Sequence, residues 1–306
     1  MTRHSMHAIR RAWMTMALTT LLIATSQDAF AGAWAQEDQG LYLKLSYARL
    51  TASEQFKDGG DTLPLLSEDI PGSFSQNGGI LYAEYGVLPK FTLTFSLLAS
   101  DVILDSNFET SRVRGLGDAF FGARYQFLDG PLVTSVSGQI KTPTGYTPDN
   151  GALRPVLGNG VLEADGRLLV GKGFAWGYFS VEAGFRWRGS RAAAGGASTV
   201  DFSDEIPYAG EIGYTLRLKN DVLNAVLIRA TANGIYGLGD PGELEAITLT
   251  PTLQRFLKVG PSIIFVLFDQ IQFNVDYMFT PTGVNTLQSR DLFVGIALDK
   301  TLGIEF

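Results

Sequence analysis

Residues 115 to 141 alternate between apolar and polar side chains on both sides of a short turn. Before the turn, the apolar positions are Ala119, Phe121, Ala123, Tyr125 and Phe127, and the positions between them include Asp118, Arg124 and Gln126. A period of two residues indicates a β-strand, because a helix repeats its apolar positions every three to four residues. The turn at 128 to 131 is rich in residues that favour tight reversals. This stretch therefore predicts a β-hairpin with one apolar and one polar face.

The same period of two recurs along the rest of the chain. It is present at 41 to 50, 78 to 88, 91 to 101, 161 to 172, 175 to 188, 208 to 218, 222 to 234, 271 to 279 and 291 to 306. These segments are mostly about ten residues long, the length that a tilted strand needs to cross a bilayer. Short turns alternate with long loops, which we place at 51 to 76, 102 to 114, 142 to 160 and 189 to 205.

The pattern is least clear between residues 235 and 268. We expect an extended loop at 235 to 258 and a strand after it, since 263 to 268 is apolar on both faces, which gives twelve strands in total. If 244 to 258 also pairs and the segment after Lys300 forms its own short strand, the number becomes fourteen. An even number is expected when both chain ends lie on the periplasmic side of a barrel.

These segments predict an all-β fold, a transmembrane antiparallel up-and-down β-barrel with short periplasmic turns and long extracellular loops. Closure of the sheet removes its edges and satisfies the backbone hydrogen bonds in lipid. A soluble β-sandwich is the alternative, but its strands are usually only about five or six residues long. The composition favours the barrel, because 35 glycines and 20 phenylalanines occur without any apolar run long enough for a transmembrane helix after residue 31.

Residues 1 to 31 predict a secretory signal peptide. Three arginines precede an apolar run from 12 to 24, and small residues follow it. Two cleavage sequences of the Ala-x-Ala type end at Ala31 and Ala35. We favour cleavage after Ala31, which leaves 32 to 306 as the barrel domain.

Charge and residue types narrow the possible partners. Cleavage after Ala31 removes three of the 24 basic and one of the 31 acidic residues, which leaves a formal net charge of −9. Such an acidic chain argues against nucleic acid as a partner, because phosphate binding needs a basic surface. The sequence has no cysteine, and both histidines, His4 and His7, lie in the signal peptide. We therefore expect no disulfide, no cofactor and no metal site.

The polar faces of the strands would line the interior of the barrel. Their basic and acidic side chains nearly cancel, which favours cross-strand ion pairs over the single-signed wall of an ion-selective pore. The candidate lumen-lining residues are Lys44, Glu84, Asp118, Arg124, Gln126, Gln139, Lys141, Glu163, Asp165, Arg167, Glu182, Arg186, Arg188, Glu211, Arg217, Arg229, Asn274 and Asp276.

The available residue types argue against an enzyme. Outer-membrane phospholipases, palmitoyltransferases, deacylases and proteases of this architecture use a histidine as base or proton relay, and none remains after cleavage. Glu163 and Asp165 share one face of a strand and allow an acid/base or cation site in principle. Pairing with Arg167 and its neighbours is the simpler interpretation. No phosphate-binding loop, zinc-ligand spacing or nucleophile elbow is present.

The order GLGD, ARY, a turn and then KTPTG within residues 115 to 145 resembles the outer-membrane proteins grouped as the MetA pathway of phenol degradation. The resemblance implies a transporter-like barrel for aromatic or other hydrophobic compounds, and it carries over no binding residue. Fatty-acid transporters and energy-coupled receptors fit less well. They place a hatch or plug domain before the first strand, where this chain offers only about nine residues after the predicted cleavage.

We therefore expect a passive channel for small apolar or aromatic molecules. These molecules would enter across the Tyr, Phe and Leu side chains of the loops at 51 to 76 and 142 to 160. The alternative is a structural or surface-interaction barrel with a closed lumen. Further expected partners are outer-membrane lipid and lipopolysaccharide, and the barrel assembly machinery, which would recognise the C-terminal Phe306.

Overall fold

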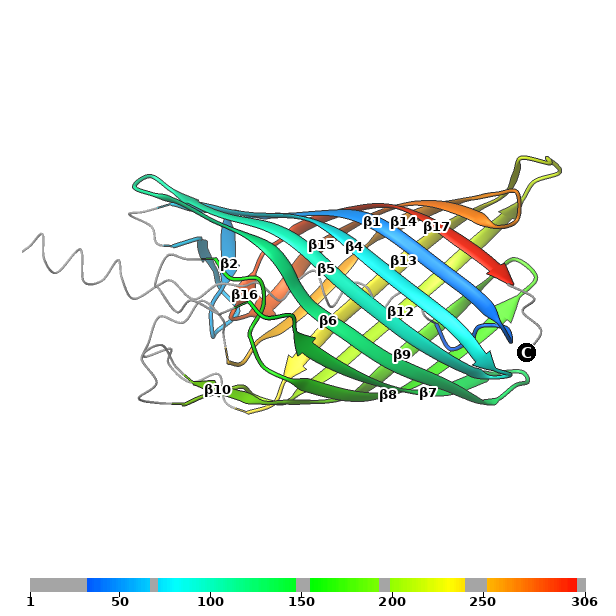
Figure 1. The fold of residues 1–306 in the computed structure, drawn as a ribbon. Helices are drawn as coiled ribbons and strands as arrows, with labels where there is room; N and C mark the ends of the chain where they lie inside the picture. The colour runs from blue at the N-terminus through cyan, green and yellow to red at the C-terminus, as the bar shows by residue number, and fades with distance from the viewer. Residues whose placement is uncertain (1–31, 67–70, 147–154, 193–198, 240–251, 302–306) are drawn as a thin grey trace, which may run out of the picture.

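The computed structural model describes residues 32–66, 71–146, 155–192, 199–239 and 252–301. These residues form a closed antiparallel barrel of twelve strands (Figure 1). In chain order the barrel strands are β1 (Gly40–Ala52), β4 (Gly72–Leu88), β5 (Phe91–Ser106), β6 (Thr110–Leu128), β7 (Val133–Pro143), β8 (Glu163–Phe174), β9 (Gly177–Arg188), β12 (Glu205–Arg217), β13 (Leu223–Gly237), β14 (Arg255–Leu267), β15 (Ile271–Val284) and β17 (Arg290–Thr301). The part of the chain that is described includes no helix of the length and hydrophobicity that a membrane crossing requires.

The sheet closes where the first barrel strand meets the last. β1 pairs with β17 from Gly40 opposite Thr301 to Thr51 opposite Arg290. Every other barrel strand pairs with its neighbours along the chain, so the sheet has no free edge. The predicted fold class and the count of twelve are confirmed, and the alternative of fourteen strands is wrong for the described residues.

The two ends of the barrel differ in their connections. Tight connections at 89–90, 129–132, 175–176, 218–222 and 268–270 lie at one end, here called the short-turn end. The opposite end, here called the long-loop end, carries two small sheets. One contains β16 (Thr286–Leu287), β2 (Glu54–Phe56) and β3 (Thr62–Pro64), and the other β10 (Ser190–Ala192) and β11 (Thr199–Asp201). In Figure 1, β2, β16 and β10 lie on the left, and the red arrow of β17 ends on the right.

Several predicted loops are too long. The connection expected at 102 to 114 is wrong, because β5 continues to Ser106 and β6 begins at Thr110. Strand residues also replace the outer parts of the loops expected at 51 to 76 and 235 to 258. The reason is that the faces change character near the long-loop end, where Val102 and Leu104 point inward and are buried while Arg112 and Arg114 are exposed.

Large apolar side chains cover the outside of the barrel. On β6 the exposed fraction is 52% for Phe121, 49% for Tyr125 and 42% for Phe127. Near the short-turn end the rings of Phe174 and Trp176 stack with centroids 5.0 Å apart. Contiguous apolar surface of this kind is unfavourable in water, and together with aromatic residues at its border it is typical of barrels embedded in a membrane.

Two predictions concern residues outside the described ranges. They are the signal peptide at 1 to 31 and the recognition of Phe306 by the barrel assembly machinery.

Candidate functional site in the barrel interior

A network of buried ion pairs crosses five neighbouring strands, β6, β7, β8, β9 and β12. Lys141 Nζ lies 3.3 Å from Asp118 Oδ2 and 2.9 Å from Glu163 Oε1. Arg188 extends the network, with Nε 3.1 Å from Glu163 Oε1 and Nη1 2.7 Å from Glu205 Oε1. None of these five side chains is more than 5% exposed. The network therefore lies inside the barrel, shielded from water.

A second row of the network lies closer to the short-turn end. Arg186 Nε is 3.2 Å from Asp165 Oδ2, and Nη1 is 3.3 Å from Glu205 Oε2. Arg167 Nε is 3.0 Å from Asp165 Oδ1, and Nη1 is 2.7 Å from Glu182 Oε1. Each guanidinium contacts carboxylates on two sides. This matters because an uncompensated buried charge costs several kcal/mol.

Smaller groups of paired charges lie on both sides of this network. Arg229 Nη1 lies 3.3 Å from Glu211 Oε2, and its Nη2 lies 3.0 Å from Asp276 Oδ1. Arg124 Nη2 lies 2.6 Å from Glu84 Oε2. These pairs join strands that neighbour each other or lie two apart around the barrel, so they hold the wall together across its circumference.

Most of the predicted lumen residues are buried in this interior. They are Lys44, Glu84, Asp118, Arg124, Gln126, Lys141, Glu163, Asp165, Arg167, Glu182, Arg186, Arg188, Glu211, Arg229, Asn274 and Asp276. Gln139 is half-buried on β7 opposite Asp165. Arg217 differs, because it is exposed at the last position of β12, where the wall ends and its side chain leaves the buried interior.

Three charged members of the interior were missed in the sequence. Glu205 was assigned to a loop, although it shares the inward parity of Glu211 on β12. Lys258 and Asp291 form an ion pair in which neither side chain is exposed. Asp291 could have been found by extending the alternation of β17 back from Leu298, whereas Lys258 lies in the region where the pattern was least clear.

The interior is apolar towards the long-loop end, which the sequence analysis did not predict. Inward-facing apolar side chains form one buried cluster there, and none is more than 7% exposed: Leu50, Phe74, Ile80, Leu98, Val102, Ile235, Phe256, Met278 and Phe293. Leu65, Leu66, Leu157 and Leu287 from the connections pack into the same cluster. The mouth of the barrel is thus filled by side chains from both the wall and the loops.

This cluster corrects the prediction that the loops offer an open apolar surface. In the described parts of those loops, Phe56, Leu65 and Leu157 are at most 6% exposed. The physical reason is that each buried apolar side chain contributes about 1.5–3 kcal/mol. Tyr146 is also drawn in and donates a hydrogen bond to Asp118 Oδ1. Burial, together with the negative charge of Asp118, raises the pKa of the Tyr146 hydroxyl far above its usual range, so the phenol stays a donor.

Residues 32 to 39, here called the strap, cross the interior at the short-turn end before β1 begins. Side chains of three strands hold its backbone: Ser135 Oγ donates to the Ala33 carbonyl, and the N–H groups of Ala35 and Gln36 donate to Gln126 Oε1 and Thr92 Oγ1, each at 2.8 Å. Ala33 is fully buried, and the Trp34 ring meets Tyr178 edge-on at 5.8 Å. The strap therefore narrows the short-turn end.

Two glycines of the wall make room for the strap. A Cβ atom at Gly86 would lie 1.8 Å from the Glu37 carbonyl oxygen, and one at Gly171 would lie 2.7 Å from the Trp34 ring. A cavity of about 430 Å³ remains beside the strap, between Trp34 and Tyr178 on one side and Arg229 on another. No group of three or more His, Cys, Asp or Glu side chains in the described part of the chain could hold a metal ion.

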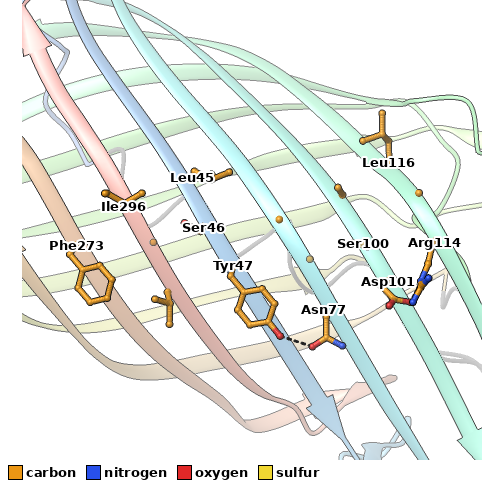
Figure 2. Close-up of a pocket in the computed structure, with 16 residues that line it drawn as sticks. Leu45, Ser46, Tyr47, Asn77, Ser100, Asp101, Arg114, Leu116, Phe273 and Ile296 are labelled. Carbon is orange, nitrogen blue, oxygen red and sulfur yellow. Dashed lines mark hydrogen bonds and ion pairs between the residues drawn. The ribbon is translucent and has the colours of Figure 1, made fainter.

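The outer wall carries a separate hollow of about 930 Å³. It lies where side chains are small, at Gly78, Gly79, Gly115 and Gly295. Figure 2 shows Tyr47 and Phe273 at the hollow and the Tyr47 hydroxyl donating to Asn77. Asp101 and Arg114 lie at its border as an ion pair, with Oδ1 and Nε 3.1 Å apart.

The fold and its interior define a class, a closed twelve-stranded barrel with an apolar outer surface and a charged core. Among solved structures the chain is similar to an outer-membrane channel from Pseudomonas putida F1, at 12% identity and a TM-score of 0.62, over 88% of this chain and 98% of the other. That likeness shows a shared fold and nothing finer.

Two further likenesses have lower TM-scores and carry no argument. The translocator domain of the autotransporter NalP from Neisseria meningitidis has 12% identity and a TM-score of 0.48, over 96% of this chain and 95% of the other. The CymD monoaromatic hydrocarbon channel has 11% identity and a TM-score of 0.40, over 89% and 90%. No family model and no curated protein matches the sequence, so the resemblance to the MetA-pathway proteins stays a prediction.

Proposed function

We propose that the protein is an outer-membrane channel for passive diffusion of small apolar molecules, with aromatic compounds among them. The observation that carries this proposal is the apolar inner wall near the long-loop end, where Leu50, Val102 and Phe256 point inward. Lipid contact requires apolar side chains only on the outside of a barrel. An apolar inner wall lowers the free energy of an apolar solute that leaves water, by about 25 cal/mol for each Å² buried.

The location is part of the same proposal. Residues 1 to 31 direct secretion, the long-loop end faces outward, and the assembly machinery recognises Phe306. The solved structure from Pseudomonas putida F1, with a TM-score of 0.62, is described as an outer-membrane channel. This description supports the proposed location and the role of a channel. No enzymatic step enters the proposal.

The packed interior favours a second candidate, a structural or surface-interaction barrel with a closed lumen. Loop side chains fill the mouth, and the strap crosses the other end. A solute that crosses the whole barrel must pass both of these obstructions. The two functions therefore differ in what happens when an obstruction is removed.

Flux into proteoliposomes tests the proposal. We expect aromatic solutes to enter faster than into protein-free vesicles, and faster still when residues 54–66 are replaced by a short Gly-Ser linker. This replacement removes Phe56, Leu65 and Leu66 from the mouth. Phe108→Ser is the matched control, because Phe108 lies in a turn at the same end and is 79% exposed. Flux equal to that of empty vesicles for the wild type and the linker variant alike would establish the closed barrel instead.

A further inference from the structure

The outer wall has a second concave surface, which lies closer to the long-loop end than the hollow in Figure 2. This groove has a volume of about 900 Å³ and is lined by residues of β1, β4, β15 and β17 and the connections above them. Its charged lining residues are Arg49, Arg290 and Glu54. The groove therefore carries a net positive charge on a chain whose formal net charge is −7.

The groove lies where the apolar outer surface ends. On β1 the outward positions run from Leu43 through Leu45 and Tyr47 to Arg49, and on β17 they run from Leu298 to Leu292 and then Arg290. Tyr277 and Phe279 of β15 line the side of the groove towards the short-turn end and are 42% and 41% exposed. Serines and Gln288 line the side towards the long-loop end. An amphipathic ligand would thus find apolar contacts on the first side and polar contacts on the second.

The two arginines lie close together and face the same side. Thr51 is opposite Arg290 in the β1–β17 register, and Arg49 is opposite Leu292, so Arg49 and Arg290 are diagonal neighbours on the outer face. Diagonal neighbours on an antiparallel pair are about 7–8 Å apart. Two guanidinium groups at this spacing can bind one phosphate group together, or two phosphates of one headgroup.

The arginines of the groove differ from those farther round the barrel at the same border. Arg112 Nη2 forms an ion pair with Asp101, and Arg114 Nε lies 3.1 Å from Asp101 Oδ1 (Figure 2 shows Arg114 beside Asp101). Within the described residues neither Arg49 nor Arg290 forms an ion pair, although both are exposed. Among the described residues, the groove therefore offers two arginines that form no ion pair, with Glu54 as the one acidic side chain in its lining.

We propose that this groove binds lipopolysaccharide of the outer leaflet, with Arg49 and Arg290 on the phosphates of its lipid A headgroup and an acyl chain against Tyr277 and Phe279. The lipid matches the groove in two ways. Its phosphates carry negative charge at the border of the membrane, where the arginines lie, and its acyl chains lie next to them inside the membrane, where the aromatic side chains lie. The inference rests on the membrane orientation in the proposed function, and it is independent of transport.

Binding of purified lipid A to the intact barrel in detergent, followed by native mass spectrometry, tests the proposal. We expect the R49Q/R290Q variant to bind diphosphorylated lipid A at least about tenfold more weakly than the wild type, because it loses the charge-assisted hydrogen bonds of both guanidinium groups to the phosphates. Dephosphorylated lipid A should bind the wild type and the variant equally weakly. Inorganic phosphate at the same concentration should not compete with lipid A. This result would show that the groove binds the whole lipid and not phosphate alone.

The matched control is R112Q/R114Q, which removes two arginines from the same border that both form ion pairs with Asp101. Its affinity for lipid A should stay within about twofold of the wild type. Equal affinity of R49Q/R290Q and the wild type, or an equal loss in both double variants, would overturn the proposal. Heat-modifiable gel migration shows that each variant is folded.

Solute flux in phospholipid vesicles should be unchanged in R49Q/R290Q, so failure of lipid binding and failure of transport can be told apart.

Discussion

Arg188 joins three strands through its guanidinium group. It forms ion pairs with Glu163 on β8 and Glu205 on β12, and its Cζ lies 4.8 Å from the centre of the Phe202 ring. Its own side chain is 1% exposed, and those of the two carboxylates are 3% and 0% exposed. Removal of the guanidinium would leave Glu163 to Lys141 and Glu205 to Arg186, and each of these two cations already contacts a further carboxylate.

We expect Arg188→Met to lower the free energy of unfolding by about 3–5 kcal/mol, the usual cost of breaking a buried ion pair from one side. Urea unfolding in detergent, followed by the heat-modifiable gel shift, measures this. Arg217→Met is the matched control, because Arg217 is exposed at the end of β12 and should change stability little. The triple variant Arg188→Met, Glu163→Gln, Glu205→Gln should recover part of the loss. Equal stability of the Arg188 and Arg217 variants would contradict the role of the network.

At the scale of single residues, the sequence predicted most of the charges that point inward but not their pairing. Parity along a strand fixes the face of Glu163 or Arg186, because successive side chains alternate. The partner of each charge depends on the register between strands, which no residue type in this sequence specifies. Arg188, for example, reaches Glu205 on a strand that begins seventeen residues later, after β10 and β11.

At the scale of elements, the strap depends on the absence of side chains in the wall. The Glu37 carbonyl lies where a Cβ atom at Gly86 would be, 1.8 Å away, and backbone atoms cannot yield as a flexible side chain can. Gly173 lies on β8 beside the cavity next to the strap, and a Cβ atom there would meet no atom within 4 Å apart from those of its chain neighbours. Comparison of alanine variants at Gly86 and Gly173 therefore distinguishes displacement of the strap from a general effect of replacing glycine by alanine.

We expect Gly86→Ala to displace the strap and to raise the ion conductance of single barrels in planar bilayers. Gly173→Ala should behave as the wild type. Conductance that is the same in both variants would show that the strap does not obstruct the short-turn end.

The strap also bears on the processing of the chain. Cleavage after Ala31 keeps Ala33, Trp34 and Ala35, whose contacts hold the strap in the interior, whereas cleavage after Ala35 would remove them. We expect the intact mass of the protein isolated from outer membranes to correspond to an N-terminus at Gly32. A mass that places the N-terminus at Gln36 would contradict both the cleavage site and the strap.

At the scale of the whole molecule, the sequence predicted the barrel because one face of each strand contacts lipid. This requirement makes Phe121, Tyr125 and Phe127 alternate visibly with smaller or polar residues. The same logic fails near the long-loop end, where the inner face is apolar as well. Residues 102 to 106 and 110 to 114 belong to strands, yet they lack the expected pattern because Val102 and Leu104 face inward and Arg112 and Arg114 outward. The strap could not be foreseen, since its place depends on contacts with three distant strands.

The pairing of β1 with β17 has a consequence for the order of assembly. Arg49 belongs to the first barrel strand and Arg290 to the last, so the two arginines become neighbours only when the ring closes. A ligand that binds the closed state and not the open one shifts the equilibrium towards closure. A glycolipid bound by both arginines would therefore stabilise the pairing of β1 with β17. The lipid of the outer leaflet would then favour closure of the barrel.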